Sequence, residues 1–169
     1  MTCRQTVLVS KREAEDSFNA AVVSGQFDYN DKLTIAFSPT KKRKVLATSG
    51  IARGTIVVSY AGELLTGWAA IRQRELEHAR ADHGCYMFIF RYNNQTYCVD
   101  ATAETGTQGR LINHSVKEPN VLPMLRVVGG GYYILFKAIR DIEANEELLY
   151  DYQETRKEVV AVLDFLTNS

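Results

Sequence analysis

Short runs of β-branched and aromatic residues, separated by turn-forming residues, fill most of residues 33–152 and constrain the fold more than any other feature. Such runs predict β-strands, while the pair Asn93–Asn94 and the glycines at 129–131 are typical of hairpin turns. No regular alternation of strands with helices is present, which argues against a dinucleotide-binding fold. Strands are expected at 34–37, 45–48, 55–60, 85–92, 95–102, 121–128, 132–138 and 148–152.

Three other segments have the periodicity of helices. Residues 11–24 predict a polar helix that stops at Gly25, and residues 154–167 predict an amphipathic helix near the other end. Between them, residues 67–81 predict a helix with Thr66 as its N-cap. The apolar face of this middle helix would consist of Trp68, Ile71, Leu76 and Ala79. The fold class is therefore expected to be α+β, mostly β, with helices at both ends.

The composition is that of one compact globular domain. A chain of 169 residues with 46% apolar residues is long enough to bury a core and too apolar to be disordered. The formal net charge of zero argues against nonspecific polyanion binding as the main function. Residues 32–62 carry six basic and no acidic residues, and residues 141–154 carry six acidic and no basic ones. This segregation could steer charged partners, or it could be two ordinary solvated stretches.

The three cysteines, Cys3, Cys85 and Cys98, form no CxxC pair, and no set of four zinc ligands has the usual spacing. No metal is therefore predicted, and unpaired thiols suit a reducing compartment such as the cytosol or nucleus. The first 30 residues lack the apolar core of a signal peptide, and no apolar run approaches the ~20 residues of a membrane helix. We expect a soluble protein without a membrane partner.

Two polar stretches could carry chemistry. Asn113 and His114 follow an apolar pair and could bind a polar ligand, or could simply cap a strand. A nucleophilic pair of Cys85 with His114 is conceivable, although nothing near Cys85 in the sequence would lower its pKa. The basic run 41–44 could contact nucleic acid, act as a nuclear address or bind an anion, and a solvated loop is the common alternative.

Several tyrosines could form a channel. Tyr150 and Tyr152 are two residues apart, so on a strand they would share a face. With Tyr60 and Tyr86 they could line an aromatic channel that attracts cations such as a sulfonium or an ammonium group. Ordinary cross-strand packing is the alternative.

Taken together, RLINHS (110–115) and EELLYDY (146–152) resemble, in order and distance, the two signature motifs of the SET-domain lysine methyltransferases. The stretch GCYMFIFRYNNQTYCVDAT (84–102) is similar to the subfamily that monomethylates the position-20 lysine of histone H4. The resemblance covers roughly residues 32–165. It implies short strands in small sheets with pseudoknot-like C-terminal threading. The implied plan is an N-terminal helical flank (1–31), the SET domain (32–152) and a C-terminal helix over the cofactor site (153–169).

The same resemblance implies S-adenosylmethionine as the cofactor, with S-adenosylhomocysteine as its product, and no metal. In the lysine channel, Tyr152 would align the amine, and a tyrosine at position 150 is associated in this family with addition of a single methyl group. Phe165 would cover the adenine where a tryptophan is usual. The implied channel residues are Tyr60, Cys85, Tyr150 and Tyr152, and the implied cofactor residues are Lys41, Arg43, Tyr86, Arg110, Asn113, His114 and Phe165.

The resemblance also implies partners: the histone H4 tail and the nucleosome, with its histones and DNA, met in the nucleus on the chromosome by a monomeric enzyme. The cofactor loop of the family is usually glycine-rich, whereas Lys42 and Lys44 stand at the glycine places here. They would be strained if those places need a positive φ. Two alternatives stay open: a SET-like histone-tail binding module with weak or no catalysis, and a methyltransferase for a non-histone protein lysine.

Overall fold

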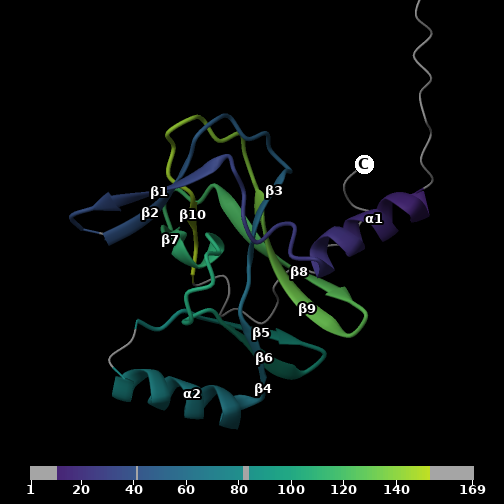
Figure 1. The fold of residues 1–169 in the computed structure, drawn as a ribbon, viewed down its shortest axis with the longest axis vertical. Coiled ribbons are helices and arrows are strands. Elements are labelled where there is room, and N and C mark those ends of the chain that lie inside the picture. Colours follow the sequence, from purple (N-terminus) through teal and green to yellow (C-terminus); the bar gives the residue numbers. More distant parts are fainter. Residues whose placement is uncertain (1–10, 41, 82–83, 153–169) are drawn as a thin grey trace, which may run out of the picture.

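A computed structural model describes residues 11–40, 42–81 and 84–152, which form four small sheets with helices α1 and α2 on opposite sides of the molecule (Figure 1). None of the helices in these ranges is long and apolar enough to cross a membrane. The elements are α1 Lys11–Val23, β1 Leu33–Ser38, β2 Lys42–Ala47, β3 Ile56–Tyr60, β4 Glu63–Thr66, α2 Trp68–Ala81, β5 Met87–Tyr92, β6 Gln95–Asp100, the 3-10 turn η1 Gly109–Leu111, β7 Asn113–His114, β8 Val121–Val128, β9 Gly131–Ala138 and β10 Leu149–Tyr150.

Both predicted hairpins are confirmed. Asn93 and Asn94 have φ values of 48° and 60°, so the β5–β6 turn has the two left-handed residues that a tight hairpin requires. Gly129 and Gly130, with φ of 55° and 81°, do the same between β8 and β9. Each hairpin gains a third strand, giving sheets of order β4-β6-β5 and β3-β9-β8. Strand β4 is not among the predicted strands, because four residues are too few to show a period.

The C-terminal part of the described chain is interleaved between earlier segments, as the predicted threading requires. Strand β10 pairs in parallel with β7. On one side the backbone N–H of Leu148 donates to the carbonyl of Val45 at 2.9 Å, and on the other the N–H of Ser115 donates to the carbonyl of Tyr150 at 3.1 Å. The strand itself is shorter than the expected 148–152, because only two residues pair in register.

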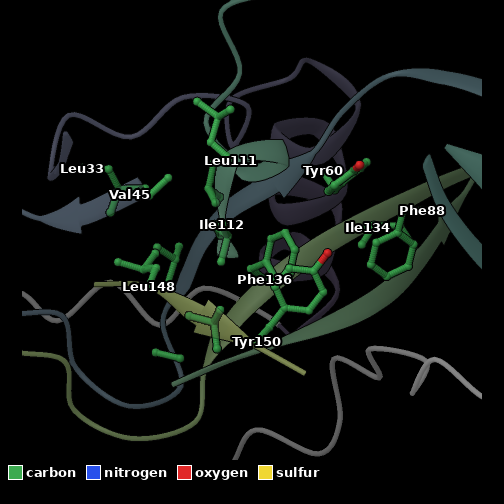
Figure 2. Close-up of a cluster of buried hydrophobic side chains, with 14 of the residues drawn as sticks. Leu33, Val45, Tyr60, Phe88, Leu111, Ile112, Ile134, Phe136, Leu148 and Tyr150 are labelled. Atoms are coloured by element: carbon green, nitrogen blue, oxygen red, sulfur yellow. The ribbon is translucent and has the colours of Figure 1, made fainter. Parts of the chain in front are cut away.

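The hydrophobic core contains two of the predicted channel residues. The residues Tyr60 and Tyr150 are each 6% exposed and lie in the main cluster with Phe136, Ile112 and Leu148. Figure 2 shows Tyr150 directly beside Phe136, with Ile112 and Leu148 close by. The core and the candidate channel are therefore built from the same side chains.

Helix α2 differs from the prediction at its start and on its buried face. Thr66 ends β4, and Gly67, with φ of 84°, is the N-cap because its carbonyl accepts the N–H of Ile71 at 3.2 Å. Only Ile71 is buried, while Trp68 and Leu76 are 55% and 53% exposed. The predicted apolar face is therefore wrong except at Ile71, which alone on the helix is buried, in a small cluster with Leu65 and Cys98.

Helix α1 agrees with the prediction, since it ends at Val23 and Gly25 follows with φ of 74°. Its side chains meet β8 through Arg126, whose Nε donates to Oδ1 of Asn19 at 2.9 Å and whose Nη2 pairs with Glu15 at 2.9 Å. The predicted C-terminal helix at 154–167 lies outside the described residues.

Candidate active site

A cavity of about 820 Å³ opens between β2, η1, the turn after β6 and Tyr152, the last residue that the structure describes. Its size is that of a site for a small organic ligand. Four of the predicted cofactor residues line it, namely Arg43, Tyr86, Arg110 and Asn113, and so does the predicted channel residue Tyr152. The sequence did not single out His78, Thr102, Ala103 and Glu104, which also line it. Lys41 and Phe165 lie outside the described residues.

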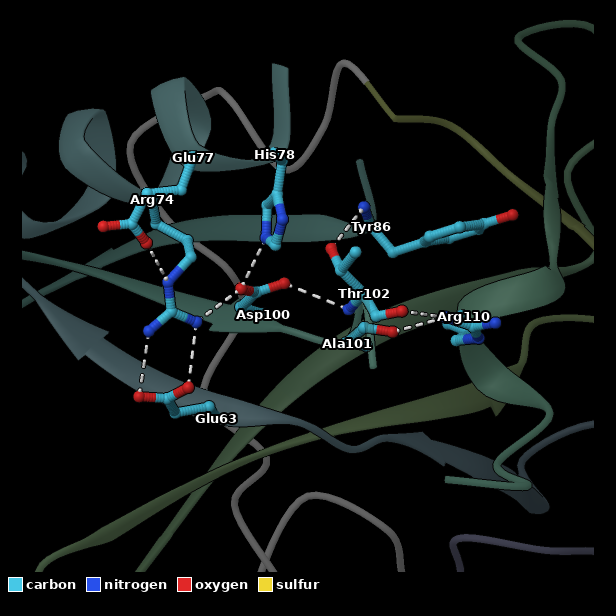
Figure 3. A network of polar contacts seen from close by, with 9 residues as sticks. All are labelled: Glu63, Arg74, Glu77, His78, Tyr86, Asp100, Ala101, Thr102 and Arg110. Atoms are coloured by element: carbon cyan, nitrogen blue, oxygen red, sulfur yellow. Dashed lines mark hydrogen bonds and ion pairs between the residues drawn. The ribbon is translucent and has the colours of Figure 1, made fainter. Parts of the chain in front are cut away.

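One wall of this cavity is strongly polar. The Arg110 side chain is 4% exposed, donates from Nη1 to the carbonyls of Ala101 and Thr102 at 2.7 and 2.9 Å, and stacks on the Tyr86 ring at 4.3 Å. Figure 3 shows these two carbonyls converging on Arg110. The Arg110 Nη2 also donates to Glu104 Oε1 at 2.8 Å, so the buried guanidinium is held from both sides.

Arg43 completes the polar wall. Its guanidinium pairs with Glu104, the carboxylate that Arg110 also contacts, and donates from Nη2 to the Tyr86 hydroxyl at 3.3 Å. The hydrogen bond from Arg43 is the main cause that lowers the pKa of the Glu104 carboxyl. Two guanidinium groups share one carboxylate, so this wall keeps a net positive charge and can take a second anionic group.

The pair Asn113 and His114 ties the C-terminal motif to the cavity. The Asn113 Nδ2 donates to the carbonyl of Arg43 and to Glu147 Oε1, both at 3.0 Å. The His114 Nδ1 accepts the backbone N–H of Tyr152 at 3.0 Å. Both side chains therefore hold neighbouring segments together by hydrogen bonds. Of the two, only Asn113 lines the cavity.

A continuous series of aromatic rings leads from the cavity into the core. The Tyr152 ring centroid lies 4.5 Å from that of Tyr150, which lies 4.8 Å from Phe136. The Tyr60 ring lies 5.3 Å from Phe88 and 6.4 Å from Phe136. Three of the four predicted channel residues, Tyr60, Tyr150 and Tyr152, thus belong to one connected group of aromatic rings. Phe88 and Phe136 were not predicted, because inward-facing strand aromatics look in sequence like ordinary core residues.

The hydroxyls of the buried tyrosines have special surroundings. In the described part of the chain no hydrogen bond joins the hydroxyls of Tyr60 or Tyr150 to another protein group. Burial raises the pKa of both phenols far above its usual range, so both stay neutral. By contrast, the Tyr152 hydroxyl donates to the carbonyl of Ile112 at 2.8 Å, which fixes its ring. The candidate channel therefore has aromatic walls that carry the neutral hydroxyl groups of Tyr60 and Tyr150.

Cys85 is exposed and precedes Tyr86 in the chain, but it is not among the residues that line the cavity. Partial desolvation and the nearby charge of Asp100 raise the pKa of its thiol, the opposite of what a nucleophilic cysteine needs. Its place in the lysine channel stays a prediction. No cluster of three metal-ligating side chains occurs among the residues that the structure describes.

The anticipated strain in the basic run is absent. Lys42 and Lys44 lie in β2 opposite Ser38 and Ala36, and neither has a positive φ. The family's glycine places are extended backbone here, which a lysine adopts without cost. Backbone strain therefore gives no reason to expect that these lysines disable the predicted cofactor loop.

Comparison with known families identifies the family of the fold. Residues 42–153 match the SET-domain family model. The chain belongs to the SET-domain family. The mostly β architecture with small sheets agrees with that family, so the fold expected from the two motifs is confirmed.

Relatives of this SET protein place it near one subfamily. It is 36% identical over 168 residues to the N-lysine methyltransferase KMT5A of Xenopus tropicalis, covering 99% of this chain and 48% of that protein. It is 32% identical over 167 residues to the histone-lysine N-methyltransferase set-1 of Caenorhabditis elegans, covering 98% and 68%. The crystal structure of CpSET8 from Cryptosporidium superposes with a TM-score of 0.73 at 30% identity, over 88% of this chain and 69% of that one. The chain spans about half the length of the Xenopus relative.

Proposed function

We propose that this chain is the catalytic domain of a protein lysine methyltransferase that uses S-adenosylmethionine and adds one methyl group to a histone lysine. The observation that carries the proposal is the position of Tyr152, which lines the polar cavity and whose ring also packs at a tilt against Tyr150 of the candidate channel. A methyl donor in the cavity and a lysine in the channel would therefore meet at one side chain.

The cavity residues suit the cofactor. Arg43 and Arg110 supply guanidinium groups for a carboxylate, and the faces of Tyr86 and Tyr152 are electron-rich surfaces for a cationic group. When bound, S-adenosylmethionine supplies a methyl group attached to a positively charged sulfur. By the family resemblance, Lys41 and Phe165 are proposed to belong to the same site.

The channel residues suit an unprotonated lysine. An amine must lose its proton before it can attack, and a dry aromatic channel lowers the pKa of an entering lysine by desolvation. Tyr60 and Tyr150 cannot serve as bases near neutral pH, because their pKa values are raised. They remain neutral hydrogen-bonding groups that orient the amine.

Alignment is the main catalytic contribution of this chain. Tyr152 is held by its hydroxyl on the carbonyl of Ile112 and by its backbone N–H on His114, so its ring is a fixed wall between cavity and channel. Holding two reactants in line can lower a barrier by several kcal/mol, on the order of 7 or more. No ionised carboxylate is required for this role.

The substrate is proposed to be the position-20 lysine of histone H4 in nucleosomes, met in the nucleus on the chromosome by a monomeric enzyme. Support comes from the 84–102 stretch and from relatives named histone-lysine methyltransferases. The basic 32–62 segment is proposed to contact nucleosomal DNA.

The test is methyl transfer from S-adenosylmethionine to an H4-tail peptide, with a matched peptide that carries arginine at the target position. We expect one methyl group on the first peptide and none on the second. Transfer to other proteins but not to either peptide would favour a non-histone enzyme. Absence of transfer, with no calorimetric binding of S-adenosylhomocysteine, would favour a histone-tail binding module.

A further inference from the structure

We propose that Asp100 is a positioning residue for the cofactor cavity and that helix α2 holds it in place through Arg74 and His78 (Figure 3). This inference rests on the proposed function, because it takes the 820 Å³ cavity as the cofactor site. Asp100 does not line that cavity, so its effect must pass through its neighbours.

Asp100 is a buried carboxylate at the end of β6 with three contacts. Its side chain is 3% exposed. One oxygen, Oδ2, accepts from Arg74 Nη1 at 2.7 Å and lies 2.8 Å from Nε2 of His78. The other, Oδ1, accepts the backbone N–H of Thr102 at 3.0 Å. A buried charge is tolerated only when it is paired and hydrogen-bonded, so the helix and the turn are both needed by Asp100.

The turn that follows Asp100 forms part of the cavity wall. The Thr102 Oγ1 accepts the backbone N–H of Tyr86 at 3.2 Å, and the Ala101 N–H donates to the Tyr86 carbonyl at 2.8 Å. The carbonyls of Ala101 and Thr102 also receive Nη1 of Arg110, whose guanidinium lies against the Tyr86 ring. The conformation of this turn therefore fixes two cavity residues, Tyr86 and Arg110, at once.

Helix α2 reaches Asp100 from the opposite side. Arg74 also pairs with Glu63, through Nη1 at 2.8 Å and Nη2 at 3.1 Å, but the Glu63 side chain is 62% exposed. Arg74 also pairs through Nε with Glu77 at 3.4 Å, and the Glu77 side chain is 51% exposed. Figure 3 shows Arg74 between Glu63 and Asp100, with His78 above Asp100. Arg74 thus has two exposed acidic partners and one buried one, and of the three only Asp100 contacts Thr102 in the cavity wall. Substitution of Asp100 or of Glu63 therefore gives a matched pair of variants, each of which removes one acidic partner of the same arginine.

The decisive variant is Asp100→Asn, with Glu63→Gln as its control. An amide has one acceptor oxygen, so it cannot accept from both the helix side and Thr102, and one contact must be lost. We expect Asp100→Asn to raise the calorimetric Kd for S-adenosylhomocysteine about tenfold, as for loss of one charge-assisted contact. The KM for S-adenosylmethionine should rise in parallel, with kcat and the peptide KM within about threefold. Glu63→Gln should change each constant by less than about twofold.

A second readout needs no cofactor. Residue-resolved hydrogen exchange should show faster exchange at the amides of Thr102 and Tyr86 in Asp100→Asn and unchanged exchange in Glu63→Gln. If Asp100→Asn does not fold, Arg74→Gln replaces it, with the same directions and a smaller rise in Kd. The inference would be overturned by unchanged hydrogen exchange at Tyr86 or by an unchanged Kd. It would also be overturned if kcat fell as much as the KM values for S-adenosylmethionine and for the peptide rose.

The two proposals fail separately. If the wild-type chain binds no S-adenosylhomocysteine, the proposed function fails, and the exchange readout alone decides whether Asp100 holds Tyr86. If the wild type binds and Asp100→Asn binds equally well, the inference fails and the proposed function stands.

Discussion

At the scale of single residues, the chemistry of this site comes from burial. Tyr60 and Tyr150 are each 6% exposed, and in the described chain their hydroxyls meet no protein partner. No fully buried side-chain oxygen of the described residues lacks a hydrogen-bond partner, so these two hydroxyls reach open space, where a substrate or a water molecule can bond them. Sequence reasoning found both tyrosines but not Phe136, which packs against them, because nothing in a strand pattern tells a channel wall from a core residue.

The Tyr150 hydroxyl should limit the number of methyl groups. In Tyr150→Phe the ring contacts with Phe136 and Tyr152 remain, while the hydroxyl no longer occupies the space of a second methyl group. We expect dimethylated product to appear beside monomethylated product in mass spectra of an H4-tail peptide. Stability should change by less than about 1 kcal/mol, because no protein hydrogen bond is lost. A variant that yields only monomethyl product would contradict this role.

Asp100 should make stability depend on acid pH. Burial opposes its ionisation, but hydrogen bonds from Thr102 and His78 outweigh burial and lower its pKa from 3.8 to about 2. A lowered folded pKa gives stability that is present above about pH 4 and lost as pH falls toward 2. At pH 7 we expect Asp100→Asn to be less stable by about 2 kcal/mol, and this difference should fade near pH 2. Urea unfolding at a series of pH values measures it, and a constant difference would speak against the pairing.

At the scale of elements, locally encoded features were predictable and pairing between distant segments was not. Both hairpins follow from left-handed turn residues, and α1 and α2 follow from helical period. Strands β4, β7 and β10 have four, two and two residues. Their pairing is fixed by neighbours in space, so no sequence period could reveal it. The prediction of the buried face of α2 was wrong for the same reason, because the side chains that the helix buries depend on which strands lie beside it.

Strand β2 should not benefit from the glycine usual in the family. Lys44 is in extended backbone opposite Ala36. We therefore expect Lys44→Gly to leave the Kd for S-adenosylhomocysteine within about twofold and to lower stability by about 0.5–1 kcal/mol, because glycine loses more backbone entropy in a strand. Calorimetry and thermal unfolding measure the two effects. A large gain in affinity would mean that the lysine does impair the loop.

The turn η1 depends on close approach to β3. A Cβ on Gly109 would overlap the carbonyl of Ser59, whereas a Cβ on Gly50 would have its nearest neighbour, the carbonyl of Ile142, at 3.9 Å. We expect Gly109→Ala to cost about 3 kcal/mol and to weaken cofactor binding by displacing Arg110. The control Gly50→Ala should lie within about 0.5 kcal/mol of wild type in chemical unfolding. Equal stability of the two variants would show that η1 can move away from β3 freely.

At the scale of the whole molecule, the site is assembled from segments far apart in the sequence. Arg43 and Asn113 are 70 residues apart and meet through a 3.0 Å hydrogen bond. No local pattern links them, and the resemblance to a family was what placed them together. Glu104, which pairs with Arg43, was missed because it lies in a loop without a period. Within the described part of the acidic 141–154 segment, the charge of Glu146 is partly neutralised, since Glu146 pairs with Arg140 at 2.5 Å.

The central claim is that the cavity and the aromatic channel are two halves of one methyltransferase site. The direct test is to incubate the purified chain with S-adenosylmethionine and recombinant nucleosomes and to read every histone by mass spectrometry. The account predicts one added methyl group on the position-20 lysine of histone H4 from the wild type, and at least tenfold less from Tyr152→Phe, which lacks the fixing bond to Ile112. Nucleosomes that remain unmethylated, although the protein binds S-adenosylhomocysteine, would contradict it.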